Sequence, residues 1–209
     1  MELEKSQIPL HEAQNTVPTE VLNGIGQTVG RLALEQFGIL DVKHSIDQLD
    51  FERYHKERNT RLLILDGDNT TFPHNQETTS TSTIQTLDNI RDHGYIEEIA
   101  LVSNNPNLDL ARARGKAICA DSVITPKCIS HMKPGDTLIQ RALVERNANA
   151  DITIGVGDGV TDYLAYVRTG LPTALVEGYG PEGARGYPLR STLRRMQGPL
   201  RSRARQIFN

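Results

Sequence analysis

Apolar residues in this chain recur as short, almost continuous runs that alternate with segments of helical spacing. The runs predict strands at Leu62 to Leu65, Ile99 to Val102, Ser122 to Ile124, Ile152 to Val156 and Thr173 to Val176. Helical patterns separate them, at Thr83 to Asp92, Leu108 to Cys119, Asp136 to Arg146 and Thr161 to Arg168. Such strands joined by helices predict an α/β fold, a three-layer Rossmann-like parallel sheet with helices on both faces, because parallel neighbours need crossovers of this kind.

The segments on either side of this pattern predict extensions of the folded core. Residues 1–20 mix acids, amides and prolines, which indicates a flexible terminus without the pattern of a secretory signal. Apolar residues near helical spacing predict an amphipathic helix over 21–40, and an acidic linker is expected over 41–60. The predicted division is 1–20, 21–60 as extension and linker, 61–180 as the core, and 181–209 as a C-terminal tail.

The composition narrows the class of protein. With 37% hydrophobic and 23% charged residues in 209, the chain is typical of a soluble globular protein. It has no apolar stretch near the ~18 residues that cross a bilayer. Cys119 and Cys128 have no metal-site spacing, and we expect reduced, buried thiols in a cytoplasmic protein.

The charge is unevenly distributed. From Gly183 to the end the chain has seven arginines and no acid, which gives this tail a charge of +7. Because the net charge is -3, the rest of the chain carries -10. Such a tail indicates an anionic partner, which could be a lipid headgroup, nucleic acid or the acidic face of another copy. The alternative is a solvated terminal segment without a partner.

Polar residues that can carry chemistry gather where the predicted strands end. Asp66 and Asp68 follow the first strand two residues apart, a spacing that lets both side chains share one site. A further carboxylate from the fourth strand's end would crowd like charges, which a hard divalent cation such as Mg²⁺ relieves. The candidate residues are Asp66, Asp68, Thr70, Ser103, Asn104, Lys133, Asp158 and Asp162.

The order of these residues resembles the haloacid dehalogenase (HAD) superfamily of phosphohydrolases. The chain has DxDxT from Asp66, a serine after an apolar strand at Ser103, Lys133-Pro134, and GDxxxD from Gly157. The resemblance covers roughly residues 60–178. It implies that Asp66 is the nucleophile that forms an aspartyl-phosphate, and that Asp68 acts as general acid and then general base.

The same resemblance implies the remaining roles. The ligands expected for Mg²⁺ are the carboxylates of Asp66 and Asp158 and the backbone carbonyl of Asp68. Phosphate is expected to contact Ser103, Asn104 and Lys133, through the Ser103 hydroxyl, the Lys133 ammonium and backbone N–H groups near Asn104. Thr70 and Asp162 are expected to support the site.

Each residue also has a structural alternative. Ser103 could cap the following segment, Thr70 could close a turn, and Asp162 could favour a helix N-terminus. Lys133 could be an exposed residue at a helix start. Arg112 and Arg114 are interpreted as a solvated helix face rather than substrate contacts. Thr71, at a position usually apolar in the superfamily, is expected to loosen the packing.

The spacing between motifs leaves no room for an inserted lid, which predicts a capless member with an open site. The stretch VKHSIDQLDFERYHKERNTRLLILDGDNT is similar to subfamily IIIA, the YqeG-type branch that includes phosphatidylglycerophosphate phosphatases. This implies a lipid phosphomonoester, with residues 21–40 and the arginine tail as peripheral contacts to an anionic membrane. The alternatives are a phosphatase of nucleic-acid ends or small metabolites, and a non-catalytic binding protein of the same fold.

Overall fold

The computed structural model describes residues 38–179, and these form one six-stranded sheet in which every neighbouring pair is parallel. The strand order is β1-β6-β5-β2-β3-β4. Five of these strands were predicted from the apolar runs. The strands are β1 (Ile39–Lys43), β2 (Leu62–Asp66), β3 (Glu98–Val102), β4 (Ser122–Ile124), β5 (Thr153–Gly157) and β6 (Thr173–Val176).

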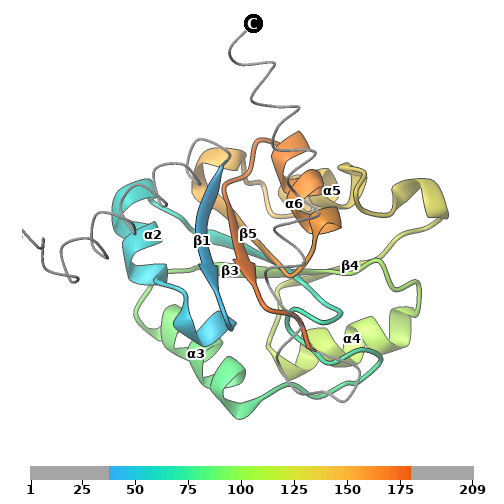
Figure 1. The fold of residues 1–209 in the computed structure, drawn as a ribbon, viewed down its shortest axis with the longest axis horizontal. Coiled ribbons are helices and arrows are strands. Elements are labelled where there is room, and N and C mark those ends of the chain that lie inside the picture. Colours follow the sequence, from blue (N-terminus) through green and yellow to red (C-terminus); the bar gives the residue numbers. More distant parts are fainter. Residues whose placement is uncertain (1–37, 180–209) are drawn as a thin grey trace, which may run out of the picture.

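Helices cover both faces of the sheet, so the predicted three-layer α/β class is confirmed (Figure 1). One layer holds the helices that follow β1, β2 and β3, and the other holds those that follow β4 and β5. Right-handed crossovers produce this arrangement when the chain first adds strands on one side of β2 and then on the other. The helices are α2 (Phe51–Arg58), α3 (Thr81–Asp92), α4 (Leu108–Ala117), α5 (Thr137–Glu145) and α6 (Val160–Arg168).

Strand β2 is the centre of the core, and all five of its residues are buried. Leu63 and Leu65 pack into the cluster beneath α2 and α3, while Leu62 and Ile64 pack into the cluster beneath α5 and α6. This division follows from the alternation of side chains along a strand. A strand buried on both faces reads as a continuous apolar run, which is why β2 was visible in the sequence.

The sheet reverses its direction of growth beside β2. The chain runs from β2 through β3 to β4 on one side, and then crosses to β5 and β6 on the other. In open α/β sheets, ligands bind beyond the carboxyl ends of the strands at such a reversal. The ends of β2 and β5 are therefore where a functional site is expected.

Residues 41–60, expected to be a linker, instead belong largely to the folded core. Strand β1 pairs in parallel with β6, and α2 buries Phe51 and Tyr54 in the core. The Asp50 side chain caps α2 by accepting a hydrogen bond from the backbone N–H of Arg53 at 3.0 Å. The arginine tail and most of the expected helix over 21–40 lie outside the described residues. Ile39 and Leu40 belong to β1, so the helix prediction is wrong at its C-terminal end.

Other expectations about the chain have mixed outcomes. Between 38 and 179 no domain is inserted between β2 and β5, which agrees with the capless prediction. The prediction of buried thiols is wrong, because Cys119 and Cys128 are both exposed. Among the described helices, none has the length and apolar character needed to cross a membrane.

Candidate active site

Three strand ends bring the predicted site residues to one edge of the sheet. Asp66 is the last residue of β2 and pairs with Val102, so Ser103 begins the next loop at the same level. On the other side Leu65 pairs with Val156, which places Asp158 just beyond the end of β5. The register of the sheet, rather than sequence proximity, therefore brings these groups together.

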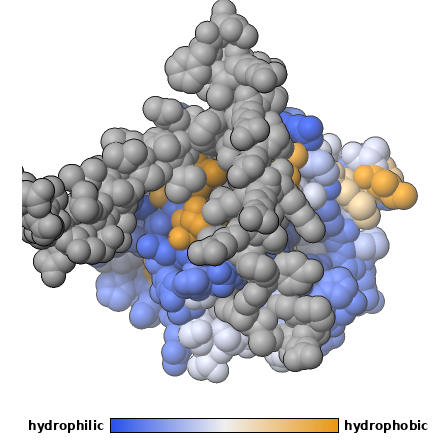
Figure 2. Space-filling view, viewed as in Figure 1, coloured by the Kyte–Doolittle hydropathy of each residue, from blue (hydrophilic) through white to orange (hydrophobic). Residues whose placement is uncertain are grey.

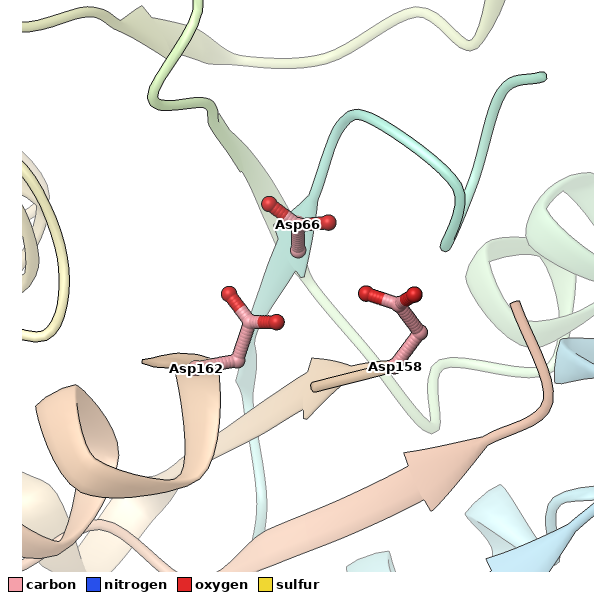
Figure 3. Close-up of side chains that lie close together, drawn as sticks. All are labelled: Asp66, Asp158 and Asp162. Carbon is pink, nitrogen blue, oxygen red and sulfur yellow. The ribbon is translucent and has the colours of Figure 1, made fainter. Parts of the chain in front are cut away.

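Asp66, Asp158 and Asp162 form a compact carboxylate cluster. One oxygen from each lies within 4.8 Å of the others, and Figure 3 shows the three side chains converging from β2, the β5 loop and the start of α6. Asp66 and Asp162 are buried, and Asp158 is partly exposed. Asp162, which was expected only to support the site, is therefore part of the carboxylate cluster itself.

Burial and crowding change the protonation of Asp66 and Asp158. Burial, with the negative charge of Asp162, raises the pKa of Asp66 to about 8. Burial and Asp162 likewise raise the pKa of Asp158 to about 7. Oxygen donors that resist ionisation without a cation fit a hard divalent ion such as Mg²⁺.

Lys133 supplies one positive charge to the cluster. Its ammonium contacts the Asp66 carboxylate and lies 2.5 Å from Asp162 Oδ1, and the side chain is 1% exposed. Burial opposes its charge, but Asp162 and Asp66 outweigh burial and hold the pKa of Lys133 well above its ordinary value. The alternative of an exposed helix-start lysine is therefore wrong. One ammonium cannot balance three carboxylates, which leaves room for a divalent cation.

Thr70 and Thr71 fix the loop after β2 to the site. The Thr70 hydroxyl donates to Asp66 Oδ2 at 2.7 Å and lies 3.3 Å from Asp158 Oδ1. The Thr71 hydroxyl donates to the Asp66 backbone carbonyl at 2.7 Å. Both residues are fully buried. Thr71 therefore has a hydrogen-bonded place in the core, and the expectation that it loosens the packing is wrong.

Ser103 and Asn104 have partners that specify what they can do. The Ser103 hydroxyl donates to Asp68 Oδ2 at 3.1 Å and accepts from the Asn105 N–H at 3.0 Å, so its capping alternative is present as well. The Asn104 side chain accepts from the Lys133 N–H at 2.7 Å and donates to the Lys133 carbonyl at 3.0 Å. Asn104 thus fixes the backbone that carries Lys133.

Asp162 combines two functions. Its Oδ1 contacts Lys133, and its Oδ2 accepts a hydrogen bond from the Gly159 N–H at 3.2 Å. The second contact caps α6, as the structural alternative for this residue predicted. Asp162 therefore orients Lys133 and caps α6 while it remains part of the carboxylate cluster.

Asp68 lies apart from the carboxylate cluster. Its side chain is 20% exposed and accepts from Ser103 on one oxygen, while the other oxygen forms an ion pair with Arg114 at 3.0 Å. Its carboxylate is therefore not among the candidate metal ligands of the described residues. Only its backbone carbonyl remains for the metal role that the resemblance implies.

Arg114 is the site residue that the sequence interpretation missed. It was interpreted as part of a solvated face, yet its side chain is 1% exposed. Arg112, two residues earlier, is exposed as expected. The signal was present, because Ala111, Arg114 and Ile118 share the buried face of α4 at helical spacing. A cation on a buried face indicates a buried partner.

Mg²⁺ should stabilise the protein more at high pH than at low pH. Without metal, Asp66 and Asp158 have folded pKa values above the ordinary 3.8, so the folded state binds more protons than the unfolded state. This contribution is complete below about pH 3.8 and is lost as pH rises through about 7 and about 8. We expect thermal unfolding to show the metal-free chain weakening, and the Mg²⁺ stabilisation growing, from about pH 5 to about pH 9.

Asp158→Asn is the control for this measurement. The variant loses one proposed ligand and one of the crowded acids, so its stability should respond less to Mg²⁺ across the same range. An equal Mg²⁺ effect at both ends of the pH range would contradict a metal bound between these carboxylates.

Comparisons with known proteins give distant structural similarities. No protein-family model matches the chain, and no curated protein matches it. The D,D-heptose 1.7-bisphosphate phosphatase from B. bronchiseptica, complexed with magnesium and phosphate, has 15% identity and a TM-score of 0.49, over 67% of this chain and 99% of that one.

Two further structures are similar at the same level. The cobalt-bound deoxy-D-mannose-octulosonate 8-phosphate phosphatase from Haemophilus influenzae has 16% identity and a TM-score of 0.43, over 69% of this chain and 89% of that one. A HAD-superfamily hydrolase of subfamily IA from Geobacter sulfurreducens has 13% identity and a TM-score of 0.44, over 56% and 89%. Similarities at these identities and TM-scores do not indicate a function, which has to be inferred from the geometry of the site itself.

Proposed function

We propose that this protein is a HAD-type phosphomonoester hydrolase that uses Mg²⁺ and forms an aspartyl-phosphate on Asp66. The observation that carries the proposal is the position of Asp66. It ends the central strand at the reversal of the sheet, contacts the Lys133 ammonium, and lies beside Asp158. A buried carboxylate with a cation at hand and a second acid for a metal is the arrangement that phosphoryl transfer requires.

The reaction needs an oriented nucleophile. Thr70 donates to one oxygen of Asp66 and Lys133 contacts the other, so the carboxylate cannot rotate freely. Attack on phosphorus forms a bond from an Asp66 oxygen and breaks the bond to the leaving alcohol. Water then attacks the aspartyl-phosphate, releases phosphate and restores the Asp66 carboxylate.

Asp68 moves the proton in both steps. It lies two residues beyond Asp66 but has separate partners, so it does not share the crowding of the carboxylate cluster. As general acid it protonates the leaving oxygen, and as general base it accepts a proton from the attacking water.

Asp66 and Asp158 would hold Mg²⁺, with the Asp68 backbone carbonyl as the third protein ligand that the resemblance implies. When bound, the ion supplies positive charge to the phosphoryl oxygens and allows the crowded carboxylates to ionise. Lys133 and the Ser103 hydroxyl lie at the same edge and are proposed to contact phosphate. Asn104 is proposed to act through its backbone, because its side chain holds Lys133 in place.

The first test is metal-dependent release of phosphate from p-nitrophenyl phosphate by the full chain. We expect release with Mg²⁺ and none with excess chelator, with recovery when Mg²⁺ is restored. Release that continues unchanged in the chelator would contradict the proposal. A complete absence of release with Mg²⁺ would favour the non-catalytic alternative, although every acid of the motifs is present.

The proposed substrate class is a lipid phosphomonoester such as phosphatidylglycerophosphate. The absence of an inserted domain between 38 and 179 supports it, because an open site accepts a substrate attached to a larger surface. The exposed large hydrophobic side chains of the described residues are scattered, at Leu108, Ile129 and Val144. Where residues are coloured, Figure 2 shows a mainly hydrophilic face with smaller hydrophobic areas near the centre and at the right. Membrane contact is therefore proposed for the part of 21–40 that precedes β1, and for the arginine tail.

A substrate panel distinguishes this proposal from its alternatives. Phosphatidylglycerophosphate in vesicles, an oligonucleotide with a terminal phosphate, and a sugar phosphate would be compared with the full chain by kcat/KM. The lipid is expected to be preferred, and anionic vesicles are expected to bind the chain more weakly as salt rises. Preference for the oligonucleotide or the sugar phosphate would assign the site to that substrate instead.

Gly178→Ala should weaken the use of Mg²⁺. A Cβ at this position would lie 2.4 Å from Asp158 Oδ2, so the carboxylate must move. The backbone cannot easily withdraw, because the Tyr179 N–H donates to the Asn69 carbonyl at 2.8 Å. We expect the Mg²⁺ concentration for half-maximal activity to rise about 10- to 100-fold. Gly159→Ala is the control, since its Cβ would meet nothing closer than 3.4 Å. Equal behaviour of the two variants would contradict this role of Gly178.

A further inference from the structure

Arg114 is a buried cation that the proposed reaction does not itself require. It extends from α4 beneath the loop that follows β2, and its guanidinium lies 5.2 Å from the centre of the Phe72 ring. A charge this deeply buried is costly unless its donors are paired. Its contacts therefore indicate what it is placed to do.

Two of those contacts fix the loop. The Arg114 Nε donates to the Gln76 carbonyl at 2.6 Å, and Nη2 donates to the Pro73 carbonyl at 3.2 Å. Both carbonyls belong to the segment that leaves the nucleophile's loop. The third nitrogen, Nη1, lies 3.0 Å from Asp68 Oδ1. One rigid guanidinium thus joins α4, the loop and the proposed general acid.

The two oxygens of Asp68 have different surroundings. Three groups face Oδ1: Arg114 Nη1 at 3.0 Å, the Asn75 N–H at 3.4 Å and His74 Nδ1 at 3.5 Å. On Oδ2 the described contact is the Ser103 hydroxyl at 3.1 Å, on the side toward β3. The contact of Nη1 with Oδ1 is an ion pair without hydrogen-bond alignment, so it acts through its charge. The positive guanidinium beside Oδ1 disfavours a proton there, which leaves Oδ2 as the oxygen better placed to carry it.

We propose that Arg114 is a positioning residue that holds Asp68 by Oδ1 and thereby makes Oδ2 the atom that carries the proton; this rests on the proposed function. In the first step the P–O bond to the leaving group breaks, the Asp66–phosphorus bond forms, and the proton on Oδ2 passes to the leaving oxygen. In the second step water gives a proton back to Oδ2 as its oxygen bonds to phosphorus and the Asp66–phosphorus bond breaks.

Lysine should not replace this arginine fully. An ammonium on a flexible chain can meet the carboxylate as a point charge, but it cannot contact two carbonyls and a carboxylate in fixed directions. Arg114→Lys should therefore recover part of the activity that Arg114→Met loses.

The test uses the dependence of kcat/KM on the leaving group. With Mg²⁺, the full chain would be given a series of aryl phosphates from p-nitrophenyl to unsubstituted phenyl phosphate. A good leaving group needs little protonation, so Arg114→Met should lose roughly 10- to 100-fold on phenyl phosphate and only a few-fold on p-nitrophenyl phosphate. Arg112→Met, on the exposed face of the same helix, should match the wild type throughout.

A double variant separates positioning from general damage to the fold. If Arg114 acts through Asp68, then adding Arg114→Met to Asp68→Asn should reduce kcat/KM on phenyl phosphate little further. An equal loss on every aryl phosphate, or additive losses in the double variant, would overturn the inference while wild-type turnover leaves the proposed function standing. No turnover by the wild type would overturn both.

Discussion

Asp66→Asn is expected to abolish phosphate release while the protein remains folded. The amide has almost the shape of the carboxylate but cannot attack phosphorus, so kcat should fall on the order of 10⁴-fold or more. Removing one of three crowded acids also relieves repulsion in a buried cluster, since Lys133 keeps its contact with Asp162. The melting temperature without metal should therefore stay constant or rise at neutral pH, as is common when a strained functional group is removed.

Two measurements check this expectation. Phosphate release is compared among the wild type, Asp66→Asn and Asp88→Asn, which changes an exposed aspartate on α3. Beryllofluoride, a mimic of phosphate on a carboxylate, is then bound with Mg²⁺ and located by crystallography. An adduct on Asp66 is expected in the wild type. Substantial turnover by Asp66→Asn would mean that another residue is the nucleophile.

The part of the fold predicted from sequence is the part whose strands are buried on both faces. Strand β2 and its neighbours are continuous apolar runs, and the polar residues at their ends follow directly along the chain. Because parallel strands end at one edge, sequence order alone was enough to predict that Asp66, Ser103 and Asp158 would meet. The structure places these three together.

The missed elements have weaker local signals. Strand β1 lies at the edge of the sheet, and its residues after Ile39 are only partly buried, with Asp41 and Lys43 among them. Its place is determined by pairing with β6, more than 130 positions along the chain in register, which no local pattern reveals. Helix α2 is largely polar, and Phe51 and Tyr54 are the two residues it buries. Two apolar positions are too few to distinguish a helix from a linker.

Prediction of the site from sequence was limited in the same way, because contacts between distant residues leave no local pattern. The motif order predicted which residues take part, but it did not predict how they pair. Asp162 orients Lys133 and caps α6, and Arg114 approaches Asp68 from a different layer of the fold. These contacts depend on the packing of helices against strand ends, so each one is fixed by distant parts of the chain. The exposure of Cys119, which has a positive φ of 50° just after α4, is likewise a local geometry that composition does not indicate.

Lys133→Met is expected to reduce both activity and stability, and the stability loss should depend on pH. Methionine has a similar length but no charge, so Asp66 and Asp162 lose the ammonium that both contact. Removing one electrostatic donor to a transferring group costs about 10²- to 10³-fold in kcat. Breaking a buried ion pair costs about 3–5 kcal/mol when the remaining charge stays buried and uncompensated. Here Asp66 can instead become neutral by binding a proton, because its pKa already lies well above its ordinary value.

The pH dependence separates this explanation from a simple loss of packing. Below the folded pKa of Asp66 this acid is protonated, and the variant should be nearly as stable as the wild type. As pH rises through about 8, Asp66 must ionise without the Lys133 ammonium, so the difference in the free energy of unfolding should grow. Mg²⁺ should reverse part of that loss, since a divalent ion can take over the charge compensation. Lys127→Met, on an exposed lysine of the same connection, is the control. A stability loss equal at every pH and indifferent to Mg²⁺ would show that Lys133 only fills space.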